Sequence, residues 1–348
     1  MLRIIRPEQK IYHIPGLGIQ TIEARAGGAI CAEAQAALDK IAALGLAVSD
    51  ETTFCSWLCG KVGDVTSTDV WVITNPATTS RFRMDVRSVA ANDKISVWWD
   101  DGTTNDYNLA TGVDTQVSRV YGAAAARVIV VLGGPRIDEL RSANWVAGDA
   151  FWGAVITDWT NLTYLNVTGS NTLSGSVAAL TKLTYLNVIG SNTLSGSVEA
   201  LTSLSFLNVI GSNTLSGSVE ALTSLSLLNV TGSNTLSGSV AALTKLTYLN
   251  IGGSNTCTGF DTAAAAITGI CNFKMNNALD EATVNGILAG FWANRDAAKP
   301  RSERVIDLND NAASAAPTGQ GIIDKAALQA YRSPNNDPTK PLWTVSTN

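Results

Sequence analysis

The stretch LTYLNVTGSNTLSGSVAALTK, residues 162–182, decides the fold because it recurs five times with a period of 21 residues. The copies fill residues 162–259 and begin at Leu162, Leu183, Leu204, Leu225 and Leu246. A fixed period in this range predicts a solenoid, in which each unit stacks only on its neighbours. Solenoids generally present extended surfaces, so the pattern favours binding over catalysis.

Each unit carries apolar residues at fixed positions. Burial of these side chains does not offset the conformational entropy that is lost when 21 residues become ordered. A single unit therefore cannot fold alone, and we expect stacking to be obligatory. In the first copy the core positions are Leu162, Leu165, Val167, Leu173, Val177 and Leu180.

The pattern L-x-x-L-x-V-x-x-S-N-x-L-x-G-x-V-x-x-L resembles the leucine-rich repeat family, whose motif is L-x-x-L-x-L-x-x-N-x-L. The copies depart from that motif at one position. The Asn comes one place late, and Ser170 stands where Asn is expected. We expect either an Asn ladder with a local bulge or Ser170 in the place of Asn. The Asn residues concerned are Asn171, Asn192, Asn213, Asn234 and Asn255.

Strand geometry sorts the residues of LTYLNV between the two faces of a sheet. Leu165 and Val167 point inward, so Tyr164 and Asn166 point outward on the concave face. Stacking of the copies then builds two outward columns, which we take as the candidate ligand-binding residues. They are Tyr164, Tyr185, Phe206, Leu227 and Tyr248 in one column, and Asn166, Asn187, Asn208, Asn229 and Asn250 in the other. A third column, at the outgoing ends of the strands, holds Thr168, Ile189, Ile210, Thr231 and Gly252.

The composition of this face indicates an uncharged ligand. From Leu162 to Asn255 the charged residues are Lys182, Glu199, Glu220 and Lys245. Aromatic rings beside amides suit a neutral glycan, because rings stack on sugars while amides hydrogen-bond hydroxyls. They equally suit a protein partner. The alternative is a structural role, because aromatic and Asn residues also stabilise sheets by cross-strand pairing.

The remainder of the chain predicts further segments around the repeats. Residues 1–64 read as a small α/β unit with strands at 11–14 and 21–23 and helices at 29–44 and 53–58. Residues 65–134 alternate with period two, which predicts strands at 70–74, 81–89, 95–100, 106–109, 116–121 and 127–132. Residues 135–161 form an N-terminal cap, in which Trp145, Phe151, Trp152 and Trp159 are bulky enough to cover the open end of the stack. The cap includes a degenerate repeat, because Ile156 and Trp159 match Val177 and Leu180 one period later. Residues 260–348 form an α/β cap with helices at 279–293 and 321–331 and strands at 304–308 and 342–346. The expected fold class is therefore mixed α/β.

Residues 98–133 resemble the second half of a PKD-type, immunoglobulin-like β-sandwich. The resemblance rests on Trp98, the Asp101-Gly102 turn, Val117, Tyr121 and Val128. A calcium site at Asp100 and Asp101 is the alternative to a polar turn, and the turn is favoured because Asp and Gly are typical turn residues.

Metal, redox and catalytic chemistry find little support in the sequence. The five cysteines form no regular pairs, so we expect small buried thiols rather than a disulfide framework. Cys55 and Cys59 share one helix face, but the single histidine, His13, leaves a metal site without enough ligands. No nucleophile or phosphate motif stands in a fitting context, and Asp307, Asp310 and Asp324 suit strand ends and helix caps. We expect no enzyme activity, no cofactor and no metal.

Charge and hydropathy narrow the partners and the location. A net charge of -5 argues against nucleic acid, and no apolar run has the length of a membrane span. The first residues do not read as a secretory signal, because polar residues interrupt them before an apolar core forms. We therefore expect export by another route, for instance within a virion.

The C-terminal sequence VIDLNDNAASAAPTGQGIIDKAALQAYRSPNNDPTKPLWTV, residues 305–345, resembles the C-terminal cap of repeat proteins from Bacteroidetes-type bacteria and their phages. The shared order is a strand, an APTGQG turn, a D-K-A-x-L helix and a W-x-V strand, with an insertion around Ser333–Pro341. The resemblance implies a phage virion protein for host-surface recognition. Its partners would be a host glycan or protein, other virion proteins through residues 1–64, and further copies of the chain. The alternatives are a bacterial cell-surface adhesin and a structural capsid or tail decoration protein.

Overall fold

The computed structural model divides the chain into two compact units, Met1–Ile137 with Gly148–Ala150 and Asp138–Ala147 with Phe151–Asn348. Strands predominate over helices in the described part, so the protein is mostly β rather than evenly mixed α/β. The structure describes residues 11–14, 18–21, 31–61, 70–75, 81–88, 90, 93–123, 126–141, 153–169, 172–252, 256–259, 272–276, 279–293, 304–308, 316–330 and 343–347.

The first unit begins with a hairpin of β1 (Ile11–Ile14) and β2 (Gly18–Thr21), which pair antiparallel. Strand β2 starts earlier than the predicted strand at 21–23, because Ile14 already pairs with Gly18. Helices α1 (Ala32–Ala43) and α2 (Glu51–Lys61) follow; α1 lies within the predicted helix at 29–44, whereas α2 extends beyond the predicted helix at 53–58 at both ends. Asp50 caps α2: its carboxylate accepts the Thr53 N–H at 3.0 Å, and hydrogen bonds from Thr53 lower the pKa of Asp50.

Six strands of the first unit lie within two residues of their predicted bounds. One antiparallel sheet has the order β3-β8-β5-β6, and β4 pairs antiparallel with β7. The pairing agrees with the alternating pattern, whereas the immunoglobulin-like assignment stays a prediction from sequence. The strands are β3 (Val70–Asn75), β4 (Arg81–Arg87), β5 (Asp93–Trp99), β6 (Thr104–Leu109), β7 (Thr115–Val120) and β8 (Arg127–Leu132).

The two helices and the β3-β8-β5 part of the sheet share one hydrophobic core. Ile41 of α1 and Phe54 of α2 are buried in the same cluster as Trp98 of β5 and Val130 of β8. The predicted boundary after residue 64 therefore falls inside a single compact unit.

A disulfide joins Cys31 to Cys59, which corrects the prediction of free thiols for these two residues. The disulfide links the start of α1 to the end of α2. The two cysteines are 28 positions apart, so no local sequence pattern indicates that they are close in space. Closing such a loop stabilises the folded state by about 3–4 kcal/mol in the chain-entropy model. Cys55 and Cys257 are buried free thiols as predicted, and burial raises the pKa of each to about 11.

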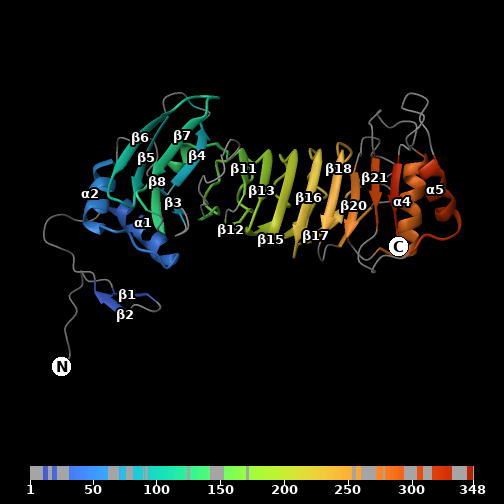
Figure 1. Ribbon diagram of the computed structural model, residues 1–348, viewed down its shortest axis with the longest axis horizontal. Helices are drawn as coiled ribbons and strands as arrows, with labels where there is room; N and C mark the ends of the chain where they lie inside the picture. Colours follow the sequence, from blue (N-terminus) through green and yellow to red (C-terminus); the bar gives the residue numbers. More distant parts are fainter. Residues whose placement is uncertain are drawn as a thin grey trace. The chain divides into compact units, whose positions relative to one another are not determined.

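The second unit is a solenoid of two parallel sheets, whose strands lie side by side in Figure 1. We call them the long sheet and the short sheet. Strand β15 (Phe206–Ser218) contributes its first half to the long sheet and its second half to the short sheet. The long sheet also holds β9 (Glu139–Arg141), β11 (Tyr164–Thr168), β13 (Tyr185–Ile189), β16 (Leu227–Gly232), β18 (Tyr248–Gly252), β20 (Asn272–Asn276), β21 (Arg304–Asp307) and β22 (Trp343–Ser346). The short sheet also holds β10 (Gly153–Val155), β12 (Thr172–Ser176), β14 (Thr193–Ser197), β17 (Thr235–Ser239) and β19 (Thr256–Thr258).

The interior between the two sheets is built from the predicted core positions. All six core residues of the first copy, and their equivalents in the next three, have 0% exposure. In each repeat the chain turns between the core Val and the core Leu that follows it by three residues. A backbone hydrogen bond closes this turn, such as that from the Leu180 N–H to the Val177 C=O at 2.9 Å. The short sheet escaped prediction because its sequence, TLSGS, has little strand propensity of its own.

A degenerate repeat begins the solenoid, as predicted. The Ile156 N–H donates to Ser174 C=O, as the Val177 N–H donates to Ser195 C=O one repeat later, both at 2.9 Å. Strand β9 pairs Glu139 with Tyr164, so it lies four residues earlier than the 21-residue period places it. Trp159 is buried as expected, and the other predicted capping residues, Trp145, Phe151 and Trp152, lie outside the described residues.

The late Asn of each copy forms a buried ladder. The Asn213 Oδ1 accepts the Leu194 N–H at 2.9 Å, and Asn213 has 0% exposure. Asn192 and Asn234 do the same for Leu173 and Leu215. The pairing register shifts between Ile210 and Asn213, so the Asn alternative with a bulge is confirmed. The first and last members, Asn171 and Asn255, lie outside the described residues.

Replacing Asn213 with Ala is expected to cost roughly 1–3 kcal/mol, because the buried Leu194 N–H loses its acceptor. The measurement is urea unfolding of the full chain, with hydrogen exchange of the repeats to locate the loss. Ser212→Ala, at an exposed neighbour, serves as the control and should change stability by less than about 0.5 kcal/mol. Equal stability of the two variants would contradict the ladder's role.

The long sheet continues past the repeats through β20, β21 and β22, all in parallel. Helix α4 (Glu281–Ala293) lies in sequence between β20 and β21, and α5 (Gly319–Ala330) between β21 and β22. The two helices and the strands at 304–307 and 343–346 match the predicted α/β elements, whereas β20 was missed. Asp324 is buried and accepts a hydrogen bond from Gln320 at 2.9 Å, which agrees with a structural role.

Candidate binding face

The outward positions of the long sheet form one face, which we call the ladder face. It consists of the ten predicted columnar residues on β11, β13, β15, β16 and β18. The register pairs Tyr164 with Tyr185, and Asn166 with Asn187, and continues in the same way from strand to strand. All ten residues are half-buried, so the structure brings together the complete predicted set.

The first three rings of the aromatic column stack on one another. Ring centroids of Tyr164 and Tyr185 lie 4.3 Å apart with planes 9° from parallel, and Tyr185 stacks on Phe206 at 4.3 Å and 12°. The guanidinium of Arg141, on β9, lies 4.2 Å from the Tyr164 ring centre. Both faces of Tyr164 and Tyr185 are therefore covered by protein groups, and these rings present their edges and hydroxyls outward.

The amide column is a continuous hydrogen-bonded ladder. The Nδ2 of each Asn donates to the Oδ1 of the preceding one, from Asn187 to Asn166 at 2.9 Å through Asn250 to Asn229 at 2.9 Å. The intermediate steps, from Asn208 and from Asn229, are 2.7 Å each. An amide has two N–H donors and two acceptor lone pairs, so Asn208 and Asn229 in the middle of the column each keep one of each, whereas Asn187 also hydrogen-bonds the Tyr185 hydroxyl.

These contacts give both columns a structural role. Stacked rings and a chain of amides hold neighbouring strands in register, which is the cross-strand alternative stated for these residues. The same contacts restrict binding to what remains available: ring edges, hydroxyls, and spare amide donors and acceptors. The stacking was not predicted because it depends on the spacing between strands rather than on sequence.

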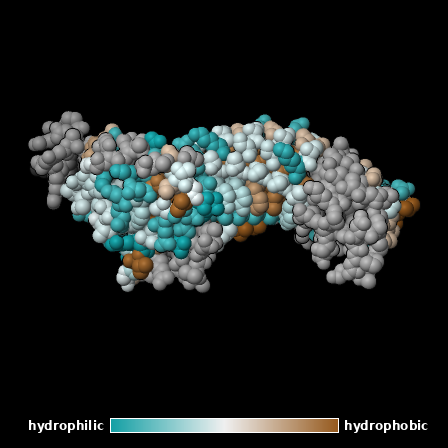
Figure 2. Space-filling model, turned by 90° about the horizontal axis from the view of Figure 1, so that it is seen from above, coloured by the Kyte–Doolittle hydropathy of each residue, from teal (hydrophilic) through white to brown (hydrophobic). Residues whose placement is uncertain are grey.

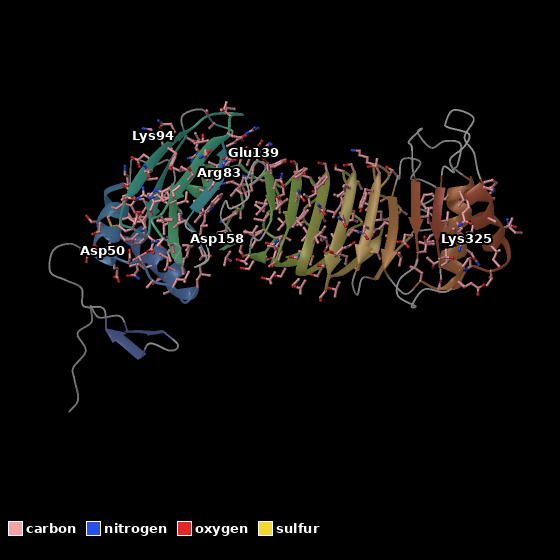
Figure 3. The ribbon with its side chains drawn as sticks, viewed as in Figure 1. Asp50, Arg83, Lys94, Glu139, Asp158 and Lys325 are labelled. Carbon is pink, nitrogen blue, oxygen red and sulfur yellow. A yellow bond between two sulfur atoms is a disulfide. The ribbon has the colours of Figure 1, made fainter. Side chains whose placement is uncertain are left out.

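Charge gathers at the beginning of the ladder face. Arg141 pairs with Glu139 at 2.6 Å, in addition to covering Tyr164, and Glu139 is labelled in Figure 3. Burial, and secondarily the neighbouring Tyr164, raise the pKa of Tyr185, so its phenol stays neutral at physiological pH. Sequence reasoning missed both charged residues, because the strand that carries them departs from the 21-residue period.

The third column adds apolar surface at the centre of the solenoid. Ile189 and Ile210 stand side by side and half-buried, where the outer strands carry Thr168 and Thr231. The surface of the repeats in Figure 2 is largely pale, as expected for a region rich in Ser, Thr and Gly.

A row of hydroxyls at the edge of the long sheet accounts for one of the positions at which the copies differ. The Ser205 hydroxyl donates to Thr184 C=O at 2.9 Å, and the Ser226 hydroxyl to Ser205 C=O at 2.8 Å. Thr184 and Thr247 make the same contact with the preceding strand. Both Thr and Ser supply the hydroxyl that makes this hydrogen bond. The copies therefore vary here only between residues that keep the contact with the preceding strand.

Neither a metal centre nor a membrane span is found in the part of the chain that the structure describes. No group of three or more His, Cys, Asp or Glu side chains is arranged for an ion there. Nor is any described helix both long and apolar enough to cross a bilayer. In the turn that contains Asp100 and Asp101, the Asp101 carboxylate forms an ion pair with Arg119 and accepts a hydrogen bond from the Thr103 N–H.

Comparison with known proteins yields distant structural likeness. No protein-family model matches the sequence. A search of curated proteins finds no match. Among solved structures, the plant peptide hormone receptor RGFR1 in complex with RGF2 is 23% identical with a TM-score of 0.32, covering 45% of this chain and 26% of the receptor chain. The PEPR1–AtPEP1 crystal structure is 14% identical with a TM-score of 0.22, covering 43% of this chain and 34% of that chain. The chain thus spans about a quarter to a third of these receptors.

Proposed function

We propose that this protein is a non-enzymatic binding protein whose ladder face recognises an uncharged, hydroxyl-rich ligand on a host-cell surface. The observation that carries the proposal is the amide ladder, in which Asn208 and Asn229 each keep one donor and one acceptor on half-buried columns that contain no charged residue. Hydroxyl groups donate and accept at once, so a neutral glycan matches this row. An oriented amide chain also loses little side-chain entropy on binding, because its members are already held in place.

The biological setting is proposed from the sequence. The C-terminal resemblance to phage and Bacteroidetes-type repeat proteins favours a virion component. In that setting residues 1–64 attach to the particle, residues 65–134 serve as an immunoglobulin-like spacer, and residues 260–348 cap the solenoid. A bacterial surface adhesin and a structural decoration protein are the alternatives.

The test is binding of the full chain to purified envelope polysaccharide from Bacteroidetes-type bacteria, beside the triple variant Tyr164→Ala, Tyr185→Ala, Tyr248→Ala. We expect the triple variant to bind at least about tenfold more weakly, a loss of about 1.4 kcal/mol. Loss of stacking also loosens the amide column beside it, so folding is followed by circular dichroism.

A matched control changes three exposed residues of the short sheet: Thr193→Ala, Thr214→Ala and Thr235→Ala. This variant should bind as the unchanged protein does. Failure of the unchanged chain to bind, or equal binding by both triple variants, would contradict the proposed function.

The three settings differ in where the protein is found. A virion component co-purifies with particles, whereas an adhesin fractionates with the cell envelope. A decoration protein buries the Tyr164–Tyr248 column against another subunit, so its rings are protected from labelling without any added ligand.

A further inference from the structure

The aromatic column is interrupted at one place. Leu227 of β16 stands in register between Phe206 of β15 and Tyr248 of β18. Phe206 has one face against Tyr185, and its other face is directed along the column towards Leu227. A leucine side chain is shorter than a tyrosine and has no flat face, so the regular ring-on-ring contact stops at Phe206, and the next ring of the column is that of Tyr248.

We propose that this break at Leu227 is a subsite for one sugar ring of a neutral glycan, an inference that rests on the proposed function. Neighbouring rings of the column are 4.3 Å apart where they stack. A single ring placed over Leu227 therefore occupies the missing step of the same column. It stacks on Phe206 on one side and on Tyr248 on the other, and the leucine forms an apolar floor.

The polar neighbours of the break favour a sugar over an aromatic side chain of a protein partner. Two residues along the strand from Leu227, Asn229 retains a spare amide donor and acceptor. Thr231 lies four residues from Leu227, about 13 Å along the strand, so its hydroxyl faces the neighbouring sugar of a chain rather than the ring over Leu227. The two preceding strands carry Ile189 and Ile210 at the position of Thr231. An apolar floor with an amide group on one side matches a pyranose, which has C–H faces and a rim of hydroxyls.

Among the five repeat strands of the long sheet, β16 alone combines a missing ring with a hydroxyl in the third column. The outward residues of β11 include both a ring and a Thr, and those of β18 a ring and a Gly. The subsite is therefore assigned to one repeat rather than to the whole column, although the repeats are nearly identical in sequence.

The experiment fills the break. Leu227→Phe should complete the ring column and occupy the position of the sugar. Using the full chain, we expect neutral hexose and N-acetylhexosamine hexasaccharides to bind the unchanged protein, and the best of them to bind L227F at least about tenfold more weakly. Leu227→Met, which keeps an apolar floor without a ring, is the control and should bind as the unchanged protein does.

A second variant tests the contact with the adjoining sugar of the hexasaccharide without altering the column. Thr231→Val removes the hydroxyl at nearly constant shape, and we expect about threefold weaker sugar binding, in line with the loss of one hydrogen bond. Thermal unfolding of each variant accompanies the binding data. L227F should unfold at a higher temperature than the unchanged chain, because it adds a stacked ring.

The outcomes separate the subsite from the proposed function. Hexasaccharide binding that is lost in L227F and reduced in T231V supports the subsite. Equal binding by L227F and the unchanged chain overturns the subsite and leaves the proposed function standing. Absence of binding to every hexasaccharide and to envelope polysaccharide overturns both. Binding of a tryptophan-bearing peptide instead, lost in L227F, overturns the sugar assignment in favour of a protein partner.

Discussion

Replacing Gly211 with Ala is expected to destabilise the solenoid by roughly 3–5 kcal/mol, enough to unfold the central repeats. Gly211 has a φ of +150°, which residues other than glycine rarely adopt. It lies in the bulge between Ile210 and Asn213, where the pairing register shifts. An added Cβ would stand 2.5 Å from the backbone oxygen of Gly190. Because the obstacle is the backbone of a neighbouring strand in a tightly stacked repeat, it cannot rotate away.

Two further glycines separate the causes of this loss. A Cβ at Gly217 meets the Ser197 side chain, which can rotate, so Gly217→Ala should cost less than Gly211→Ala. Gly102 has a φ of +80° with no heavy atom within 4 Å of its added Cβ, so Gly102→Ala reports the conformational cost alone, about 1 kcal/mol. Urea unfolding and hydrogen exchange of the full chain measure all three. A Gly211→Ala variant as stable as Gly102→Ala would refute the close packing of the bulge.

Excision of one complete period is expected to leave a folded protein. Removing residues 186–206 joins Tyr185 to Leu207 and restores the reading LTYLNVI. The second and third copies differ only at Thr184/Ser205 and Tyr185/Phe206, so the new interface repeats contacts that already exist. The remaining repeats should therefore keep their hydrogen-exchange protection.

Excision of 22 residues at the same place should prevent the repeats from folding. Removing residues 186–207 gives LTYNVIG, which moves Asn208 to a core position and Val209 to the outer face. A one-residue shift exchanges the two faces of a strand, so a polar amide is buried and apolar side chains are exposed. We expect a loss above about 4–5 kcal/mol, seen as collapsed protection or aggregation. Similar protection in the 21- and 22-residue deletions would contradict the obligatory register.

Periodicity carried much of the fold prediction. Leu165 and Val167 repeat with the same phase in each copy, so their burial and the outward direction of Tyr164 and Asn166 follow from strand geometry. The β-rich segment of the first unit was read in the same way, from alternation over short stretches. These features depend on residues close in sequence, so the local spacing of apolar residues is enough to predict them.

The features that escaped prediction depend on contacts between distant residues or on spacing across strands. The Cys31–Cys59 disulfide joins two helices, and β9 leaves the period because of a four-residue offset. In the candidate site, the columns were predicted but the ring stacking was not. The sequence indicates which residues share a column. The spacing between strands determines that Tyr185 stacks with one ring face on Tyr164 and with the other on Phe206.

The most direct test of the account is hydroxyl-radical footprinting of the full chain with and without the envelope polysaccharide. The account predicts that the polysaccharide reduces labelling of Tyr185, Phe206 and Tyr248, with the largest change at the two rings that flank Leu227. Labelling of the exposed Val113 and Val120 in the first unit should not change. Protection of those valines with an unchanged ladder face would contradict the claim that the outer face of the long sheet binds the ligand.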